Sequence, residues 1–166
     1  MSTATEQIRM SLDEARTVAH EVVRILKPVC ERVEVAGSVR RERISCGDVE
    51  IVCVTRFGPA FVRDPDSMFG GLDHDGVNLQ LNLVRELIQD GVLEPRLSKT
   101  GVAATGERFQ RLLFHPRSLR SLGSRDPDAA ESAPVPLDLF CALPPAQWGL
   151  IFAVGTGPMK FNRCLV

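Results

Sequence analysis

The chain is most informative over residues 35–53, which read VAGSVRRERISCGDVEIVC. An apolar run leads into Gly37 and Ser38, basic residues follow, and a second apolar run carries Asp48 and Glu50. Side chains alternate between the two faces of a strand, so the two acids should share one face. The residues between and after them should face the core: Val49, Ile51 and Cys53. Adjacent acids repel each other unless a cation lies between them, so the segment predicts a cation site on a strand.

The turn between the two runs is suited to bind phosphate. Gly37 and Ser38 offer backbone N–H groups and a hydroxyl, and Arg41 offers a planar set of donors. Phosphate donors beside paired carboxylates predict nucleotide chemistry.

Length and composition restrict the class of protein. The 166 residues predict one domain with its own core, and the net charge of −1 excludes a general attraction to nucleic acid or anionic membranes. Any DNA contact must come from a local patch such as Arg40, Arg41 and Arg43. The five cysteines form no C-x-x-C pair, which favours buried, reduced thiols in a cytoplasmic protein. The amino terminus has no apolar signal core, and no apolar run is long enough to span a membrane, so we expect a soluble chain.

Strands and helices are expected to interleave along the chain. Ser11 and Glu14 have capping-box spacing and should begin a helix that Pro28 ends near Leu26. The next predicted elements are a strand at 33–37, a basic turn at 40–46, a strand at 47–55 and a loop at 57–78. A helix should begin at Leu79 and end at Asp90-Gly91, and a loop with short strand pieces should follow at 93–105. Strands are then predicted at 107–114 and 135–143, joined by a connection at 115–134, before a helix that runs through Trp148 to about Val154 and is broken by Gly155-Thr156-Gly157. This order predicts an α+β fold with a mixed, mostly antiparallel sheet backed by helices. Residues 11–157 would form the domain, after a flexible tail at 1–10 and before the start of a further helix at 158–166.

Asp138 is the third candidate acid, flanked by apolar residues in its strand. It could be a surface position on an edge strand, but together with Asp48 and Glu50 a shared site is favoured. Three converging carboxylates suit Mg²⁺ or Mn²⁺, and two such ions suffice for phosphoryl or nucleotidyl transfer. By contrast, residues 73–75 (Asp-His-Asp) are better interpreted as an exposed polar loop than as metal ligands.

These residues match a known family. In order and spacing, Gly37-Ser38, Arg40-Arg41, Gly47-Asp48-x-Glu50, Asp138 and Thr156-Gly157…Phe161-Asn162 resemble the palm of the family X DNA polymerases, within the nucleotidyltransferase superfamily. The resemblance implies a polymerase beta-like palm in which Asp48, Glu50 and Asp138 are catalytic and hold two Mg²⁺ or Mn²⁺ ions. It implies that Gly37, Ser38, Arg41 and Gly47 bind the triphosphate, that Gly157 lies at the sugar and Asn162 at the base, and that Asp138 helps to deprotonate the primer hydroxyl. Leu97-Ser98-Lys99 and residues 106–114 resemble the strand near the template, which makes Lys99, Arg108 and Arg111 candidate DNA contacts.

The sequence departs from the family pattern in three places. Glu50 stands where the family usually has aspartate, and its longer arm should still reach a metal. Val154-Gly155 replaces a pair that contains an aromatic residue, so discrimination against ribonucleotides should be weak. The thumb and the amino-terminal DNA-gripping domain are expected to be absent. We therefore expect a monomer whose partners are a nucleoside triphosphate and primer-template or gapped DNA. Its binding to DNA should be weak and should be assisted by another partner.

Two other functions are compatible with the same residues. The chain could transfer a nucleotide to another acceptor, such as a protein, a small molecule or an RNA end. It could also be a non-catalytic, nucleotide-binding remnant of a palm. The intact set of Ser38, Arg41, Asp48, Glu50 and Asp138 favours an enzyme.

Overall fold

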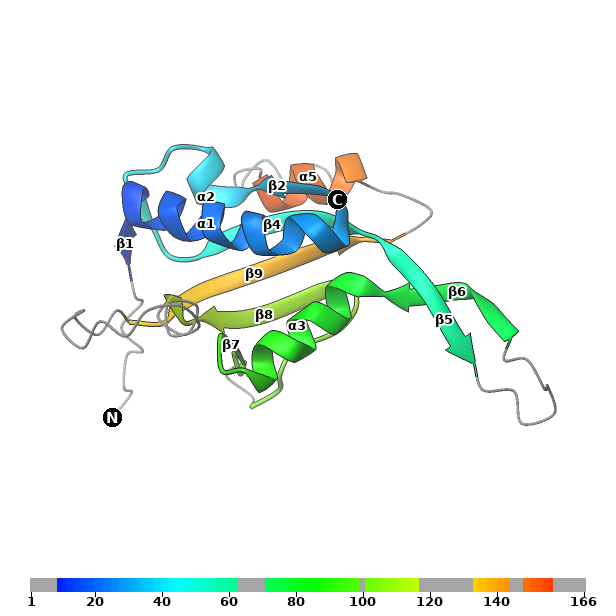
Figure 1. Ribbon diagram of the computed structural model, residues 1–166. Coiled ribbons are helices and arrows are strands. Elements are labelled where there is room, and N and C mark those ends of the chain that lie inside the picture. The colour runs from blue at the N-terminus through cyan, green and yellow to red at the C-terminus, as the bar shows by residue number, and fades with distance from the viewer. Residues whose placement is uncertain (1–8, 63–70, 99–100, 117–132, 144–147, 157–166) are drawn as a thin grey trace.

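A five-stranded sheet forms the centre of the fold in the computed structural model, which describes residues 9–62, 71–98, 101–116, 133–143 and 148–156 (Figure 1). Its strands lie in the order β2 (Cys30–Val35), β4 (Val49–Thr55), β9 (Val135–Ala142), β8 (Phe109–Phe114) and β7 (Leu93–Pro95). β4 and β9 pair in parallel, and the other neighbours pair antiparallel. The prediction of an α+β fold with a mixed, mostly antiparallel sheet backed by helices is therefore confirmed.

Helix α1 (Leu12–Leu26) begins and ends where the sequence predicts. The Glu14 N–H donates to Ser11 Oγ at 3.3 Å, and the Ser11 N–H donates to Glu14 Oε2 at 2.8 Å, which completes the capping box. Pro28 lies in the 3₁₀ turn that follows, η1 (Lys27–Val29). The buried side of α1 consists of small and branched apolar residues: Ala15, Val18, Ala19, Val22 and Leu26.

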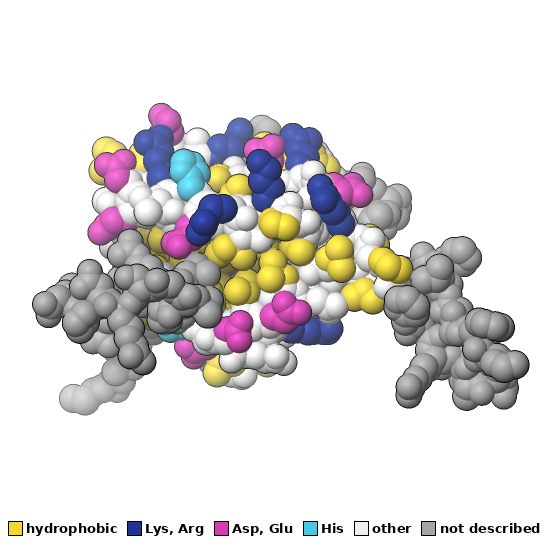
Figure 2. Space-filling model, in the orientation of Figure 1, with side chains coloured by type: hydrophobic (Ala, Val, Ile, Leu, Met, Phe, Trp, Pro, Cys, Tyr) yellow, Lys and Arg dark blue, Asp and Glu magenta, His cyan; other side chains and the backbone are white. Residues whose placement is uncertain are grey.

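Helix α3 (Leu79–Gln89) is capped by Asn78, whose Oδ1 accepts the Leu81 N–H at 3.0 Å. Gly91, with φ of 71°, closes its far end as predicted. The helix is joined to β8 by two fully buried amides, because Gln80 Nε2 donates to Gln110 Oε1 at 3.0 Å. α3 and α1 cover the same face of the sheet (Figure 1), and Figure 2 shows apolar side chains gathered on the surface between them.

The prediction of a loop at 57–78 is wrong. β5 (Phe57–Val62) and β6 (Gly71–Asn78) pair antiparallel and form a two-stranded hairpin that projects away from the main sheet (Figure 1). Their glycines, proline and acids are disfavoured in strands, which hid the pattern. The pairing satisfies the backbone groups that a loop would leave to water. Residues 73–75 thus lie on a strand.

Smaller differences occur at the ends of elements. Gly37–Arg40 forms the short helix α2 instead of the end of a strand, and Met10 belongs to β1 (Met10–Ser11), which pairs with β3 (Ser45–Cys46), instead of to a tail. Helix α5 (Trp148–Thr156) includes Gly155 and Thr156. The prediction that the helix is broken from Gly155 onward is therefore wrong for these two residues. One glycine costs a helix only about 1 kcal/mol, which packing can offset.

The predicted thiols are present wherever the structure describes them. Cys30, Cys46, Cys53 and Cys141 are free and buried, and Cys164 lies outside the described residues. Also outside them are residues 1–8 and 157–166, which include most of the predicted tail and the predicted C-terminal helix start. None of the helices in the described part of the chain is both long and apolar enough to cross a membrane.

Candidate functional site

Three charged side chains lie in a row across the middle of the sheet. Glu50 of β4 is the direct partner of Asp138 on β9, and Asp138 is the direct partner of Arg111 on β8. Partner residues in neighbouring strands point to the same face, so these side chains are neighbours. Their face is opposite to the one that α1 and α3 cover, because Ile51 and Leu139, next along their strands, belong to the core under those helices.

Asp138 is buried and held by two arginines. Its side chain is 6% exposed, Arg96 Nη2 lies 2.7 Å from Oδ1, and Arg111 Nη2 lies 3.5 Å from Oδ2. Since β9 is the central strand of the sheet, the alternative of a surface position on an edge strand is wrong. Burial raises the pKa of Asp138 above its usual value, Arg96 and Arg111 lower it, and Asp48 raises it further.

Arg96 is a site residue that the sequence reasoning missed. It follows β7, and its backbone N–H donates to the Arg111 carbonyl at 2.9 Å, which fixes its backbone beside β8. Its partner Asp138 is 42 residues away in sequence. No local sequence pattern connects two positions so far apart. The one signal for Arg96 in the sequence was that it directly precedes Leu97-Ser98-Lys99, which had been singled out as resembling the strand near the template.

Glu50 contacts the turn that was predicted to bind phosphate. The Ser38 N–H donates a hydrogen bond to its carboxylate, and the Ala36 N–H donates to its carbonyl at 2.8 Å. Gly37 has φ of 58°, and a Cβ there would overlap the Glu50 carboxylate and lie 2.9 Å from its Cγ. The turn therefore requires glycine at position 37 for two independent reasons, its backbone conformation and the approach of Glu50.

The charge on Glu50 is strongly influenced by its surroundings. Burial raises its pKa to about 7, with further contributions from Asp48 and Asp138, while Arg41 and the Ser38 N–H lower it. Asp48 itself is half-buried just before β4, and its carbonyl accepts the Ser38 hydroxyl at 3.5 Å. The predicted trio of acids thus shares one electrostatic environment beside the Gly37–Ser38 turn.

The carboxylates are at present directed to protein partners. Asp138 faces the two arginines and Glu50 faces the Ser38 N–H. In the described ranges, no group of three His, Cys, Asp or Glu side chains is arranged to hold a metal ion. The repulsion among Asp48, Glu50 and Asp138 nevertheless makes the position favourable for a divalent cation, which hard carboxylate oxygens suit.

Helix α5 packs beside this site through cation–π contacts. The guanidinium of Arg40, in α2, lies 4.8 Å from the ring centroid of Phe152, and that of Arg32 lies 4.3 Å from the ring of Trp148. The two rings stack with centroids 5.6 Å apart. Trp148 is therefore part of the packing between α5 and β2, and Arg40 links the Gly37–Ser38 turn to α5.

Only some of the remaining predicted site residues lie in the part of the chain that the structure describes. Gly47 precedes Asp48, and a Cβ at this position would meet nothing within 4 Å. Arg108 is exposed, and Arg111 lies over the Phe109 ring at 5.8 Å as well as beside Asp138. Lys99, Gly157 and Asn162 lie outside the described residues.

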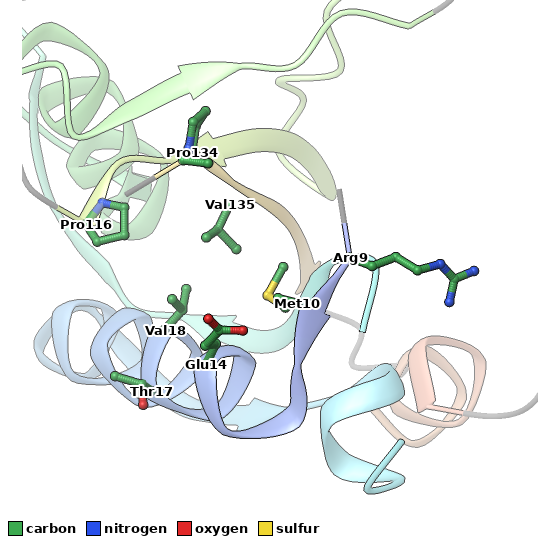
Figure 3. Close-up of a pocket in the computed structure, with 9 residues that line it drawn as sticks. Arg9, Met10, Glu14, Thr17, Val18, Pro116, Pro134 and Val135 are labelled. Carbon is green, nitrogen blue, oxygen red and sulfur yellow. The ribbon is translucent and has the colours of Figure 1, made fainter. Parts of the chain in front are cut away.

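A cavity of about 420 Å³ lies between α1 and the start of β9 (Figure 3), and Asp48, Glu50 and Asp138 do not line it. Apolar side chains of α1, β1 and the start of β9 surround it, among them Val18, Met10 and Val135, and Arg9 points away from it in Figure 3. Its carboxylate, Glu14, is already used in the capping box. Because its described lining is mostly apolar and includes a carboxylate, the cavity suits a phosphate less well than the Gly37–Ser38 turn does.

Comparison with known proteins adds no assignment: no protein-family profile matches the chain, and no curated protein matches it as a relative.

Proposed function

We propose that this chain is a nucleotidyltransferase that transfers a nucleotide from a nucleoside triphosphate to the 3′-hydroxyl of a DNA primer, with a palm like that of the family X DNA polymerases. The observation that carries the proposal is the direct pairing of Glu50 with Asp138 on parallel strands, beside the Gly37–Ser38 turn. Carboxylates at this spacing next to backbone and hydroxyl donors combine a cation site with a phosphate site.

The electrostatics of the site support two Mg²⁺ or Mn²⁺ ions held by Asp48, Glu50 and Asp138. Asp48 raises the pKa of both other acids, and a divalent cation among them would relieve that repulsion. When bound, the ions would neutralise the triphosphate and make the attacking hydroxyl more acidic.

The residues of the chain itself would orient the reactants. Ser38 and Arg41 would bind the β- and γ-phosphates, which pass close to the backbone at Gly47 because that position has no side chain. The primer 3′-oxygen attacks the α-phosphorus, its proton passes to Asp138, and the bond to the bridging oxygen breaks to release pyrophosphate. From the resemblance alone, Gly157 would lie at the sugar, Asn162 at the base, and Lys99 and Arg108 at DNA phosphates.

Primer extension on a short gapped duplex tests the proposal, with Mg²⁺ or Mn²⁺ and each dNTP or rNTP. Asp48→Asn and Asp138→Asn remove a charge at nearly constant volume and should abolish templated extension. Glu34→Gln is the matched control, since Glu34 pairs with Val52 on the same face of the sheet but its side chain is 46% exposed and bonded to Arg32. This variant should extend the primer like the wild-type protein.

The outcomes separate the alternatives. Extension that survives Asp138→Asn contradicts the proposed chemistry. Triphosphate binding without extension of DNA, but with transfer to a protein, a small molecule or an RNA end, would assign another acceptor, and binding without any transfer would identify a non-catalytic remnant. A preference for dNTP over rNTP by orders of magnitude would contradict the weak sugar discrimination predicted from Val154-Gly155.

A further inference from the structure

The proposed reaction gives no role to Arg96, yet Arg96 makes the shortest contact to Asp138 that the structure shows. Its Nη2 lies 2.7 Å from Oδ1, against 3.5 Å for Arg111 and Oδ2, and its side chain is 25% exposed, against 44% for Arg111. A distance of 2.7 Å is that of a strong, charge-assisted hydrogen bond.

We propose that Arg96 is an internal counter-ion of Asp138 that a divalent cation must displace, and that Arg96 thereby sets the affinity of the site for that cation. Arg96 is then a positioning residue, and the inference rests on the cation site of the proposed function.

The argument begins with the burial of Asp138. A carboxylate that is 6% exposed is unfavourable without compensation, and the two arginines supply it in the structure described here. Both carboxylate oxygens face a guanidinium, so a cation that binds Asp138 must compete with a positive charge at each oxygen.

Exchange between the guanidinium and a cation does not require the backbone to move. The Arg96 N–H stays bonded to the Arg111 carbonyl, while the long side chain of Arg96 can rotate away from Asp138. The same carboxylate is thus neutralised before and after the cation binds. Arg111 is a weaker competitor because its contact is longer and more exposed.

Titration of the metal-free protein with Mn²⁺, followed by the electron paramagnetic resonance signal of free Mn²⁺, tests this role. Arg96→Met removes the competing charge and should tighten Mn²⁺ binding by roughly tenfold, on the basis of the Coulomb energy at this separation after screening by salt. Arg96→Lys keeps the charge and should stay near the wild-type affinity. Arg24→Met removes an exposed charge from α1, on the far face, and should change nothing.

Two further measurements guard against a trivial result. Asp138→Asn should weaken binding and, combined with Arg96→Met, should remove the gain. Thermal unfolding of the metal-free Arg96→Met variant should show a lower Tm than the wild type, and saturating Mn²⁺ should raise that Tm by more than it raises the wild-type value. A partly unfolded variant cannot produce tighter binding.

The result that overturns the inference alone is Mn²⁺ binding that requires Asp138 in the wild type and is unchanged or weaker in Arg96→Met. Mn²⁺ binding that is independent of Asp138, or no binding, overturns the inference together with the cation site of the proposed function.

Discussion

Replacement of Gly37 by alanine should destabilise the protein more than the same change at Gly47 or Gly91, where an added Cβ would meet nothing within 4 Å. The φ of 58° at Gly37 is in the left-handed region, where a residue with a Cβ loses about 1 kcal/mol. The new methyl would also overlap the Glu50 carboxylate and lie 2.9 Å from its Cγ, so Glu50 must move. The displaced carboxylate loses the Ser38 N–H bond, at a further cost of about 1–2 kcal/mol.

The total of about 2–3 kcal/mol can be measured by urea unfolding in the presence of EDTA. Two glycines serve as matched controls. Gly91 has φ of 71° and nothing within 4 Å of a Cβ, so Gly91→Ala isolates the backbone cost of about 1 kcal/mol. Gly47 has open space and no positive φ, so Gly47→Ala should leave the free energy of unfolding nearly unchanged.

Adding Glu50→Ala to Gly37→Ala should recover the part of the lost unfolding free energy that comes from the steric overlap, because it removes the side chain that the new methyl displaces. The reasoning is refuted if Gly37→Ala costs no more than Gly91→Ala, or if the second substitution recovers nothing.

Three other predictions concern stability in metal-free solution. Because the pKa of Glu50 is raised from 4.5 to about 7, its contribution to stability is present below pH 4.5 and is lost as the pH rises through 7. The loss is about 1–2 kcal/mol after solvent screening, and urea unfolding between pH 5 and 8 should show it in the wild type but not in Glu50→Gln. Gln110→Leu leaves the buried Gln80 amide without its acceptor and should cost about 1–3 kcal/mol in the same assay, whereas Gln80→Leu with Gln110→Leu should cost less than the sum of the single changes. Ser11→Ala removes the acceptor of the capping box and should cost about 1 kcal/mol, with Thr17→Ala, which keeps the cap, nearer to zero.

The central part of the site could be predicted because the information is local. Alternation with apolar residues correctly predicts that Glu50 lies on one face of its strand, whereas Asp48, which was predicted to share that strand, lies just before β4. The strand pattern of Asp138 alone was compatible with a surface position, and its combination with Asp48 and Glu50 favoured a shared site; the position of β9 beside β4 agrees with that preference.

Other features could not be predicted because their cause lies elsewhere in the chain. The hairpin of β5 and β6 is stabilised by mutual pairing against the preferences of its own residues. The role of Arg96 depends on a contact across 42 residues, and the extension of α5 through Gly155 depends on packing against β4. In each case tertiary contacts override a local preference.

The parallel pairing of β4 with β9 also has a consequence for folding. Glu50 and Asp138 are 88 residues apart, and the hairpin, α3, β7 and β8 all lie between them in sequence. A slip of one residue in this pairing would turn Asp138 toward the core and place a leucine beside Glu50, so the site exists in one register alone. Since contacts of long sequence separation form only after a large loop-closure entropy has been overcome, the pairing should be completed late in folding. Recovery of cation binding during refolding should therefore follow the slowest phase, after the helices and the β5–β6 hairpin have formed.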